Sequence, residues 1–147
     1  SARRVYRLPT EAKWEYACRA GSKTKYPFGG DASALKDYEW YKANAGGRTH
    51  AVATKTPNAW GLSDMGGNVW EWCQDWYDEI EYQQYANPRS VDPFGPRTGA
   101  NRVLRGGSWG NNDRFCRPAV RGRNDSAYRD HVTGFRLALG GAAERAH

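Results

Sequence analysis

The stretch that most constrains how this chain folds is residues 58–74, which read NAWGLSDMGGNVWEWCQ. Glycines, aromatic rings and oxygen donors alternate here too closely for an ordinary helix or strand. The pair Gly66-Gly67 allows backbone conformations that are closed to other residues, and Asp64 and Glu71 bracket it. Carbonyl groups turned inward between two carboxylates can surround a hard cation, which prefers oxygen ligands. The alternative is that Asp64 and Glu71 cap turns and pair with arginines.

The composition favours one loop-rich domain. A chain of 147 residues is long enough to bury a core without a metal or disulfides. It contains seven tryptophans, nine tyrosines, 17 glycines and seven prolines. Large rings bury much area per residue and can organise loops that lack regular hydrogen-bond ladders. We therefore expect a small amount of helix and sheet, with Trp70, Trp72 and Trp109 in the core.

Several classes of function are not supported. The formal net charge is +6, but the arginines are scattered and no helix-turn-helix or zinc-finger spacing occurs, so we expect no nucleic-acid partner. No stretch approaches the roughly eighteen apolar residues of a membrane span, and the first residues do not form a signal peptide. The three histidines are too dispersed to suggest an iron triad, and a serine-hydrolase nucleophile elbow is absent.

Local patterns predict one clear helix and a few short strands. Thr10 can cap the start of a helix, Gly21 can stop it, and Glu15 and Arg19 lie one turn apart. Its apolar face would hold Trp14, Ala17 and Cys18. A short helix is expected over residues 32–38. Strands are expected over 69–76, where the residues alternate with a period of two, and over 102–105 and 134–139.

Three further stretches complete a recognisable set: RLPTEAKWEYA at 7–17, RVLRGGSW at 102–109 and GFRL at 134–137. With residues 58–74, they make the chain similar to the formylglycine-generating enzymes, or sulfatase-modifying factors, across roughly residues 3–139. The resemblance implies an α+β, C-type-lectin-like fold, loop-rich with short antiparallel strands and few helices. It also implies that residues 1–147 form the C-terminal portion of a single domain whose N-terminal part is missing here, either because the chain is a fragment or because another segment completes it.

The resemblance also implies a structural calcium site. Its ligands would be Asp64, the main-chain carbonyls of Gly67 and Val69, and Glu71. A second calcium site of the family would begin near residues 44–45. The following loop is shorter here and its acidic partner has no counterpart, so we do not expect that second site.

The cysteines argue against copper chemistry. In the copper-dependent oxidases of this family, two cysteines bind Cu(I), a soft ion that favours thiolates. Counted from Ser108, their positions are occupied here by Asn111 and Cys116. One thiolate can neither supply paired coordination nor exchange disulfides without a resolving partner. Cys116 then becomes a buried small hydrophobe, or a disulfide partner of Cys73 in an oxidising compartment, while Cys18 is a core thiol.

Residues 110–139 contain no Lys, Glu, Gln, Met or Trp, although those five types supply 23 of the 109 residues before them. Every residue type present can be encoded by changing the adenines of an Asn codon. This pattern is left by diversity-generating retroelements, whose variable proteins resemble the formylglycine-generating enzymes and keep their variable region after an RGGSW motif, found here at 105–109. The alternative is that ordinary family members are also rich in Asn, Asp and Arg here.

We therefore interpret the chain as a non-catalytic ligand-binding domain with a variable surface over residues 110–132. The ligand would be a protein or other macromolecule, and a cell-surface or secreted location would suit such a role. The alternative is an oxidase that acts on a peptidyl cysteine or related thiol through Cys116 and Ser108. Mixed donors, acceptors, charges and aromatic faces suit binding. The candidate ligand-binding residues are Asn111, Asn112, Asp113, Arg114, Phe115, Arg117, Tyr128, Arg129, Asp130 and His131.

Overall fold

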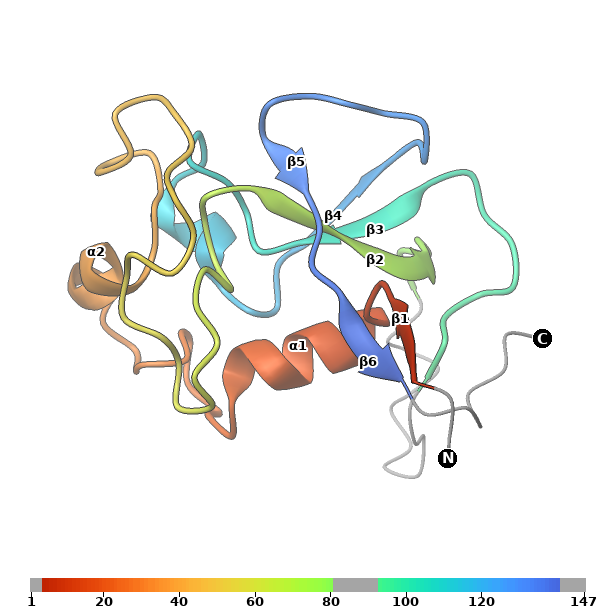
Figure 1. The fold of residues 1–147 in the computed structure, drawn as a ribbon, viewed down its shortest axis with the longest axis horizontal. Helices are drawn as coiled ribbons and strands as arrows, with labels where there is room; N and C mark the ends of the chain where they lie inside the picture. The colour runs from red at the N-terminus through yellow and green to blue at the C-terminus, as the bar shows by residue number, and fades with distance from the viewer. Residues whose placement is uncertain (1–3, 81–92, 141–147) are drawn as a thin grey trace.

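The computed structural model describes residues 4–80 and 93–140. Short elements separated by long loops make up this part of the chain, as expected for a loop-rich α+β fold (Figure 1). In chain order they are β1 (Val5–Arg7), α1 (Glu11–Arg19), the 3-10 helix η1 (Ala32–Ala34), α2 (Leu35–Tyr38), β2 (Trp70–Trp76), β3 (Arg102–Arg105), the 3-10 helix η2 (Asp113–Cys116), β4 (Arg121–Asn124), β5 (Thr133–Gly134) and β6 (Ala138–Gly140).

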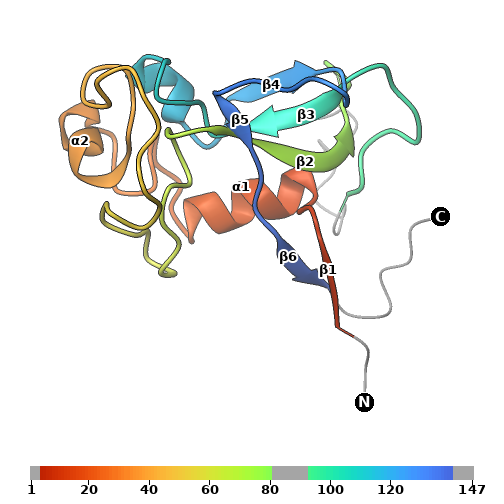
Figure 2. The ribbon, with the colours of Figure 1, turned by 45° about the horizontal axis from the view of Figure 1, so that its top comes forward.

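Helix α1 begins and ends where the sequence predicts. The Thr10 side chain accepts a hydrogen bond from the Lys13 amide, and Ala20 adopts a left-handed conformation with φ of 46° just before Gly21. Glu15 and Arg19 form the expected ion pair at 2.9 Å. The helix lies beneath the larger sheet and packs against β2 and β3, as Figure 2 shows. The helix thereby connects the sheet to the buried side chains of the core.

Two sheets share the strands. The larger has the order β4-β3-β2-β5, and β1 pairs with β6 in a separate antiparallel ribbon. The expectation of antiparallel strands holds for every pair among the described residues except β2 with β5, which is parallel. The single strand predicted over 134–139 is wrong: β5 and β6 share that stretch and belong to different sheets. Strands β1 and β4 have no counterpart in the sequence prediction.

The core consists of two clusters of buried side chains. The first contains Trp14, Cys18, Met65, Cys73 and Val103. The second contains Tyr26, Leu35 and Cys116. Along β2 the predicted alternation is present, with every second side chain buried.

The placement of the tryptophans corrects the sequence prediction. Trp70 and Trp72 lie on the half-buried face of β2, and Trp109 is also half-buried. Trp14 is the buried tryptophan, with 1% of its surface exposed. The polar tips of the half-buried rings explain part of this difference, since Trp109 Nε1 donates to the His131 carbonyl at 3.2 Å.

In the described residues no helix is both long and apolar enough to cross a membrane.

Candidate functional site

The loop that the sequence assigns to calcium turns sharply. Asp64, Gly67 and Asn68 all adopt positive φ, at 56°, 73° and 57°. A side chain at Gly67 would collide with the main chain of Trp40, because an added Cβ would lie 2.2 Å from its carbonyl oxygen. Asp64 Oδ2 accepts from the Ala53 amide at 2.7 Å, whereas Oδ1 is buried without a hydrogen-bond partner. An orphaned, buried carboxylate oxygen is compatible with a role as a cation ligand.

Glu71 is engaged differently. Its Oε2 accepts from Trp14 Nε1 at 2.7 Å and from Arg136 Nε at 2.6 Å, and its Oε1 accepts from Arg136 Nη2 at 2.8 Å. Burial acts to lower the pKa of Arg136, but the hydrogen bond and charge of Glu71 outweigh it, so the pKa is raised. The contacts of Glu71 therefore match the alternative in which this residue pairs with an arginine. The calcium role of Asp64, Gly67, Val69 and Glu71 stays a prediction.

Glu39 belongs to the same neighbourhood, although sequence reasoning missed it. Trp40 pairs with Gly67 in a parallel bridge, and the Asn68 amide donates to the Trp40 carbonyl at 2.7 Å. The Glu39 side chain is buried, and its Oε2 has no hydrogen-bond partner. Burial, and then the charge of Asp64, raise its pKa. No local pattern around residue 39 signals this position, because its neighbours come from a loop far along the chain.

Side chains of His, Cys, Asp and Glu do not gather in metal-binding groups of three or more anywhere in residues 4–80 and 93–140. Any cation at this loop would therefore depend on main-chain carbonyls or water as well as on carboxylates.

Ser108 and Cys116, on which the oxidase alternative depends, are both buried. Asn111 Oδ1 accepts from both the Ser108 amide at 3.0 Å and Ser108 Oγ at 2.8 Å, so Asn111 holds the serine in its turn. Cys116 is buried in the second core cluster, and burial raises the pKa of its thiol. Cys18 and Cys73 lie in the other cluster, and all three thiols are free. The alternative of a Cys73–Cys116 disulfide is not realised, because the two residues belong to different clusters.

None of the ten predicted ligand-binding residues is buried, and they fall into two groups. The first includes Asn112 and Asp113, which line a hollow of about 530 Å³ together with Tyr41 and Lys42. The second is residues 128–131, on the loop before β5. Strand β4 lies between them in sequence, so residues 110–132 are not a single display loop. The Trp109 ring stands 5.5 Å from that of His131.

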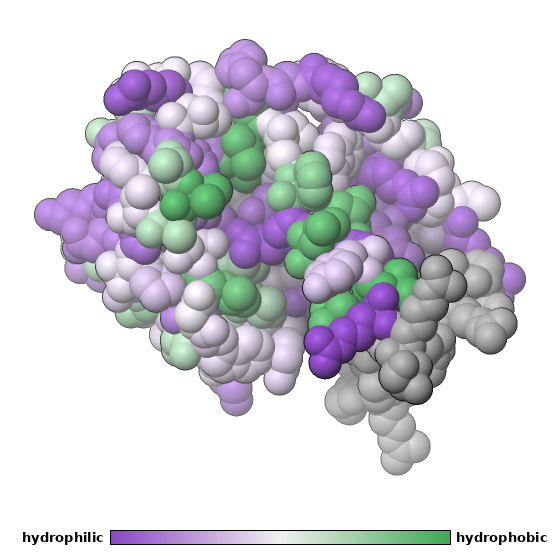
Figure 3. All heavy atoms as spheres, viewed as in Figure 1, coloured by the Kyte–Doolittle hydropathy of each residue, from purple (hydrophilic) through white to green (hydrophobic). Residues whose placement is uncertain are grey.

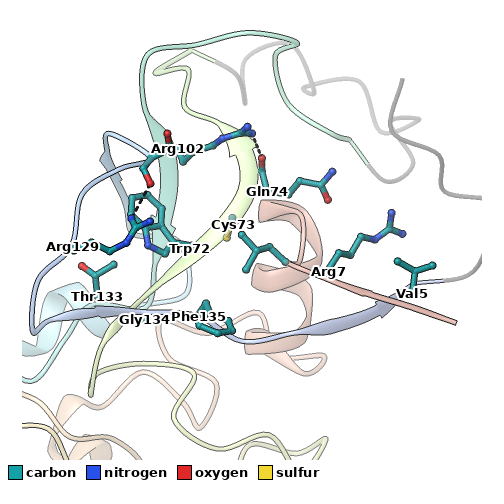
Figure 4. Close-up of a pocket in the computed structure, with 12 residues that line it drawn as sticks. Val5, Arg7, Trp72, Cys73, Gln74, Arg102, Arg129, Thr133, Gly134 and Phe135 are labelled. Carbon is teal, nitrogen blue, oxygen red and sulfur yellow. Dashed lines mark hydrogen bonds between the residues drawn. The ribbon is translucent and has the colours of Figure 1, made fainter.

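A larger pocket of about 890 Å³ opens beside the second group. Figure 4 shows its walls, in which Trp72 and Gln74 come from β2, Arg102 from β3 and Arg129 from the loop before β5. The Arg102 side chain donates to the Gln74 carbonyl. The described lining residues include three arginines and no carboxylate. Of these residues, the sequence predicts Trp72 in the core and Arg129 in the binding surface, and it offers Cys73 as the alternative disulfide partner of Cys116.

The surface next to this pocket is apolar. Figure 3 shows hydrophobic side chains gathered over the connection from β5 to β6. Phe135, Leu137 and Leu139 are each more than half exposed there, at 66%, 58% and 51%. Apolar clusters on a surface commonly mark contacts with other molecules or segments.

Fold, loop geometry and motifs together define one class of protein. Residues 1–140 match the family described as the sulfatase-modifying factor enzyme 1-like domain. The chain belongs to this family, as the sequence motifs indicated.

The proteins that are similar to this chain differ in the activities that their names describe. The chain is 39% identical to the formylglycine-generating enzyme of Streptomyces coelicolor, covering 90% of this chain and 46% of that protein. It is 35% identical to the hercynine oxygenase of Mycolicibacterium smegmatis, covering 90% of this chain and 32% of that protein. The chain thus spans less than half the length of these relatives.

Solved structures of other proteins share the fold. Treponema denticola variable protein 1 superposes with a TM-score of 0.81 at 41% identity, over 90% of this chain and 46% of that one. PvdO from Pseudomonas aeruginosa superposes with a TM-score of 0.79 at 31% identity, over 91% of this chain and 52% of that one. The chain is therefore similar to enzymes as well as to a variable protein. Family membership alone does not select between catalysis and binding.

Proposed function

We propose that the chain is a ligand-binding domain that does not perform thiol oxidation. The observation that carries this proposal is the interior position of Cys116, combined with Asn111 at the position of the first of the two expected cysteines. A thiolate is the nucleophilic and metal-binding form of cysteine, and burial that raises its pKa keeps Cys116 a neutral thiol at pH 7. The oxidase alternative would need two accessible thiols near Ser108.

The ligand surface would comprise residues 111–117 and 128–131. Exposed arginine, tyrosine, histidine and asparagine side chains there combine charge, hydrogen bonding and aromatic area, as in protein paratopes. The likeness to a variable protein supports a protein as the ligand. Catalysis of the kind named for the enzyme relatives remains the second candidate, because those relatives match 90% of this chain.

Binding at this surface can be tested with a phage-displayed library of random twelve-residue peptides. Peptides selected on the wild-type chain are measured against a triple variant, Arg114→Ser, Tyr128→Asn and Arg129→Gly, whose positions are exposed. A matched control carries Lys23→Ser and Lys25→Ser, at exposed positions of another loop. We expect most selected peptides to lose at least tenfold in affinity for the triple variant alone. Equal affinity for both variants would show that binding lies elsewhere.

A further inference from the structure

The calcium-type loop contains more buried negative charge than its arginine can balance. Glu39, Asp64 and Glu71 are 7%, 8% and 6% exposed. Their electrostatic neighbour of opposite charge is Arg136, and Asp64 and Glu71 both act on Glu39. Three carboxylates around one guanidinium leave a net negative charge in a poorly solvated place. Such a charge is costly to bury unless a proton or a cation compensates it.

The hydrogen bonds show which carboxylate oxygens lack partners. Both oxygens of Glu71 are occupied by Trp14 and Arg136. Glu39 Oε2 and Asp64 Oδ1, in contrast, are buried with no hydrogen-bond partner. Arg136 Nη2 is also shared with the main-chain carbonyls of Ser63 and Asp64, at 3.1 and 3.0 Å. Arg136 therefore donates to Glu71 and to the loop backbone. Among the described residues, none of its hydrogen bonds reaches Glu39 Oε2 or Asp64 Oδ1.

The backbone brings Glu39 to this loop. The bridge between Trp40 and Gly67 aligns the segment after α2 with the turn. A Cβ added to Gly66 would come within 3.4 Å of the Glu39 carboxyl carbon, so this carboxyl group lies directly against the turn that follows Asp64. Two carboxylates from separate segments, each with one oxygen that has no hydrogen-bond partner, thus lie at one loop.

We propose that Glu39 and Asp64 are the two carboxylate ligands of one divalent, oxygen-preferring cation such as calcium, and that Glu71 holds Arg136 instead of the ion. This ligand set differs from the one implied by resemblance, in which Glu71 binds the metal and residue 39 has no role. Calcium takes about six to eight oxygen ligands, so main-chain carbonyls such as those of Gly67 and Val69, together with water, would complete the shell. The inference is independent of the proposed peptide-binding surface.

The test uses calcium chloride alone, added to the chain after chelator treatment. Binding is measured by calorimetry, and thermal unfolding is followed by circular dichroism. A cation that binds only the folded state raises the melting temperature with concentration. We expect a saturable rise for the wild type and for Asp37→Asn, a control on α2 whose side chain is exposed. Glu71→Gln should melt lower at every concentration, because its ion pair is weakened, yet keep the calcium-dependent rise.

The deciding variant is Glu39→Gln, which should bind calcium at least tenfold more weakly and should melt higher than the wild type in chelator, because one buried charge is removed. Asp64→Asn is the second variant, since Asn tolerates the positive φ of that residue. It should lose the same response, and it decides the matter if Glu39→Gln does not fold. A wild type that ignores calcium would overturn the proposal. Wild-type affinity in Glu39→Gln, or lost affinity in Glu71→Gln, would overturn the ligand assignment.

Discussion

At the scale of single residues, Glu11 joins α1 to three strands of the larger sheet. Its carboxylate accepts from Arg105 Nε at 2.8 Å and from Arg121 Nε and Nη2 at 2.6 and 2.9 Å. Its amide donates to Asp75 at 2.7 Å. The helix is thereby attached to β2, β3 and β4 through one residue. Arg105 is completely buried and also pairs with Glu15 at 2.6 Å.

We predict that Glu11→Gln lowers the free energy of unfolding by about 3 kcal/mol, because removing one partner leaves a buried guanidinium undercompensated. Urea denaturation monitored by tryptophan fluorescence measures the change. Glu79→Gln serves as the control, since that side chain is exposed and surface substitutions usually change stability by about 0.5 kcal/mol or less. A loss below about 1 kcal/mol for Glu11→Gln would mean that this network behaves like a set of surface pairs.

At the scale of elements, the sequence predicts those whose determinants are local. Thr10 and the glycine after the helix define α1, and alternation defines β2. The boundary at residues 134–139 depends on distant contacts: Gly134 pairs with Glu71, whereas Ala138 pairs with Arg7. Strand β4 was missed because RGRN lacks an apolar alternation, and it is an edge strand held only by β3 among the described residues.

The residues of the candidate site divide in the same way, into those with a local sequence signal and those that depend on distant contacts. Asp64 and Glu71 could be selected from one continuous segment. Arg136, which is 65 residues from Glu71, and Glu39 could not be assigned to them, because the long loops that bring them together contain no periodic signal. The spacing of residues in the sequence therefore identified the loop, but not the charged side chains from other segments that surround it.

The tryptophans provide a prediction about which elements support the fold. Trp14→Ala should lower the free energy of unfolding by about 3 to 5 kcal/mol, the usual result for a large aromatic removed from a core. Trp72→Ala and Trp109→Ala should each cost less, because their rings remain partly exposed. Urea denaturation of the three variants gives the ranking. If Trp109→Ala is the most damaging, the half-buried rings are more central to stability than the burial pattern indicates.

At the scale of the whole molecule, the two core clusters meet at neighbouring residues. Met65 packs in the first cluster, while a Cβ at Gly66 would lie 2.9 Å from the carbonyl oxygen of Cys116 in the second. Opening one cluster therefore disturbs the backbone on which the other rests. This arrangement favours unfolding of the described domain as one cooperative unit.

The cysteines can report this cooperativity. Burial raises the pKa of the Cys18, Cys73 and Cys116 thiols, and the thiolate is the reactive form, so the folded chain should react slowly with Ellman's reagent at pH 8. We predict fewer than one reacted thiol per chain in the time in which a free thiol reacts fully, and three per chain in guanidinium chloride. Mass spectrometry after partial alkylation should find all three sites labelled at one common rate, set by global opening. Selective labelling of Cys116 in the folded chain would show that the second cluster opens separately, and it would favour the oxidase alternative, which requires that thiol to be accessible.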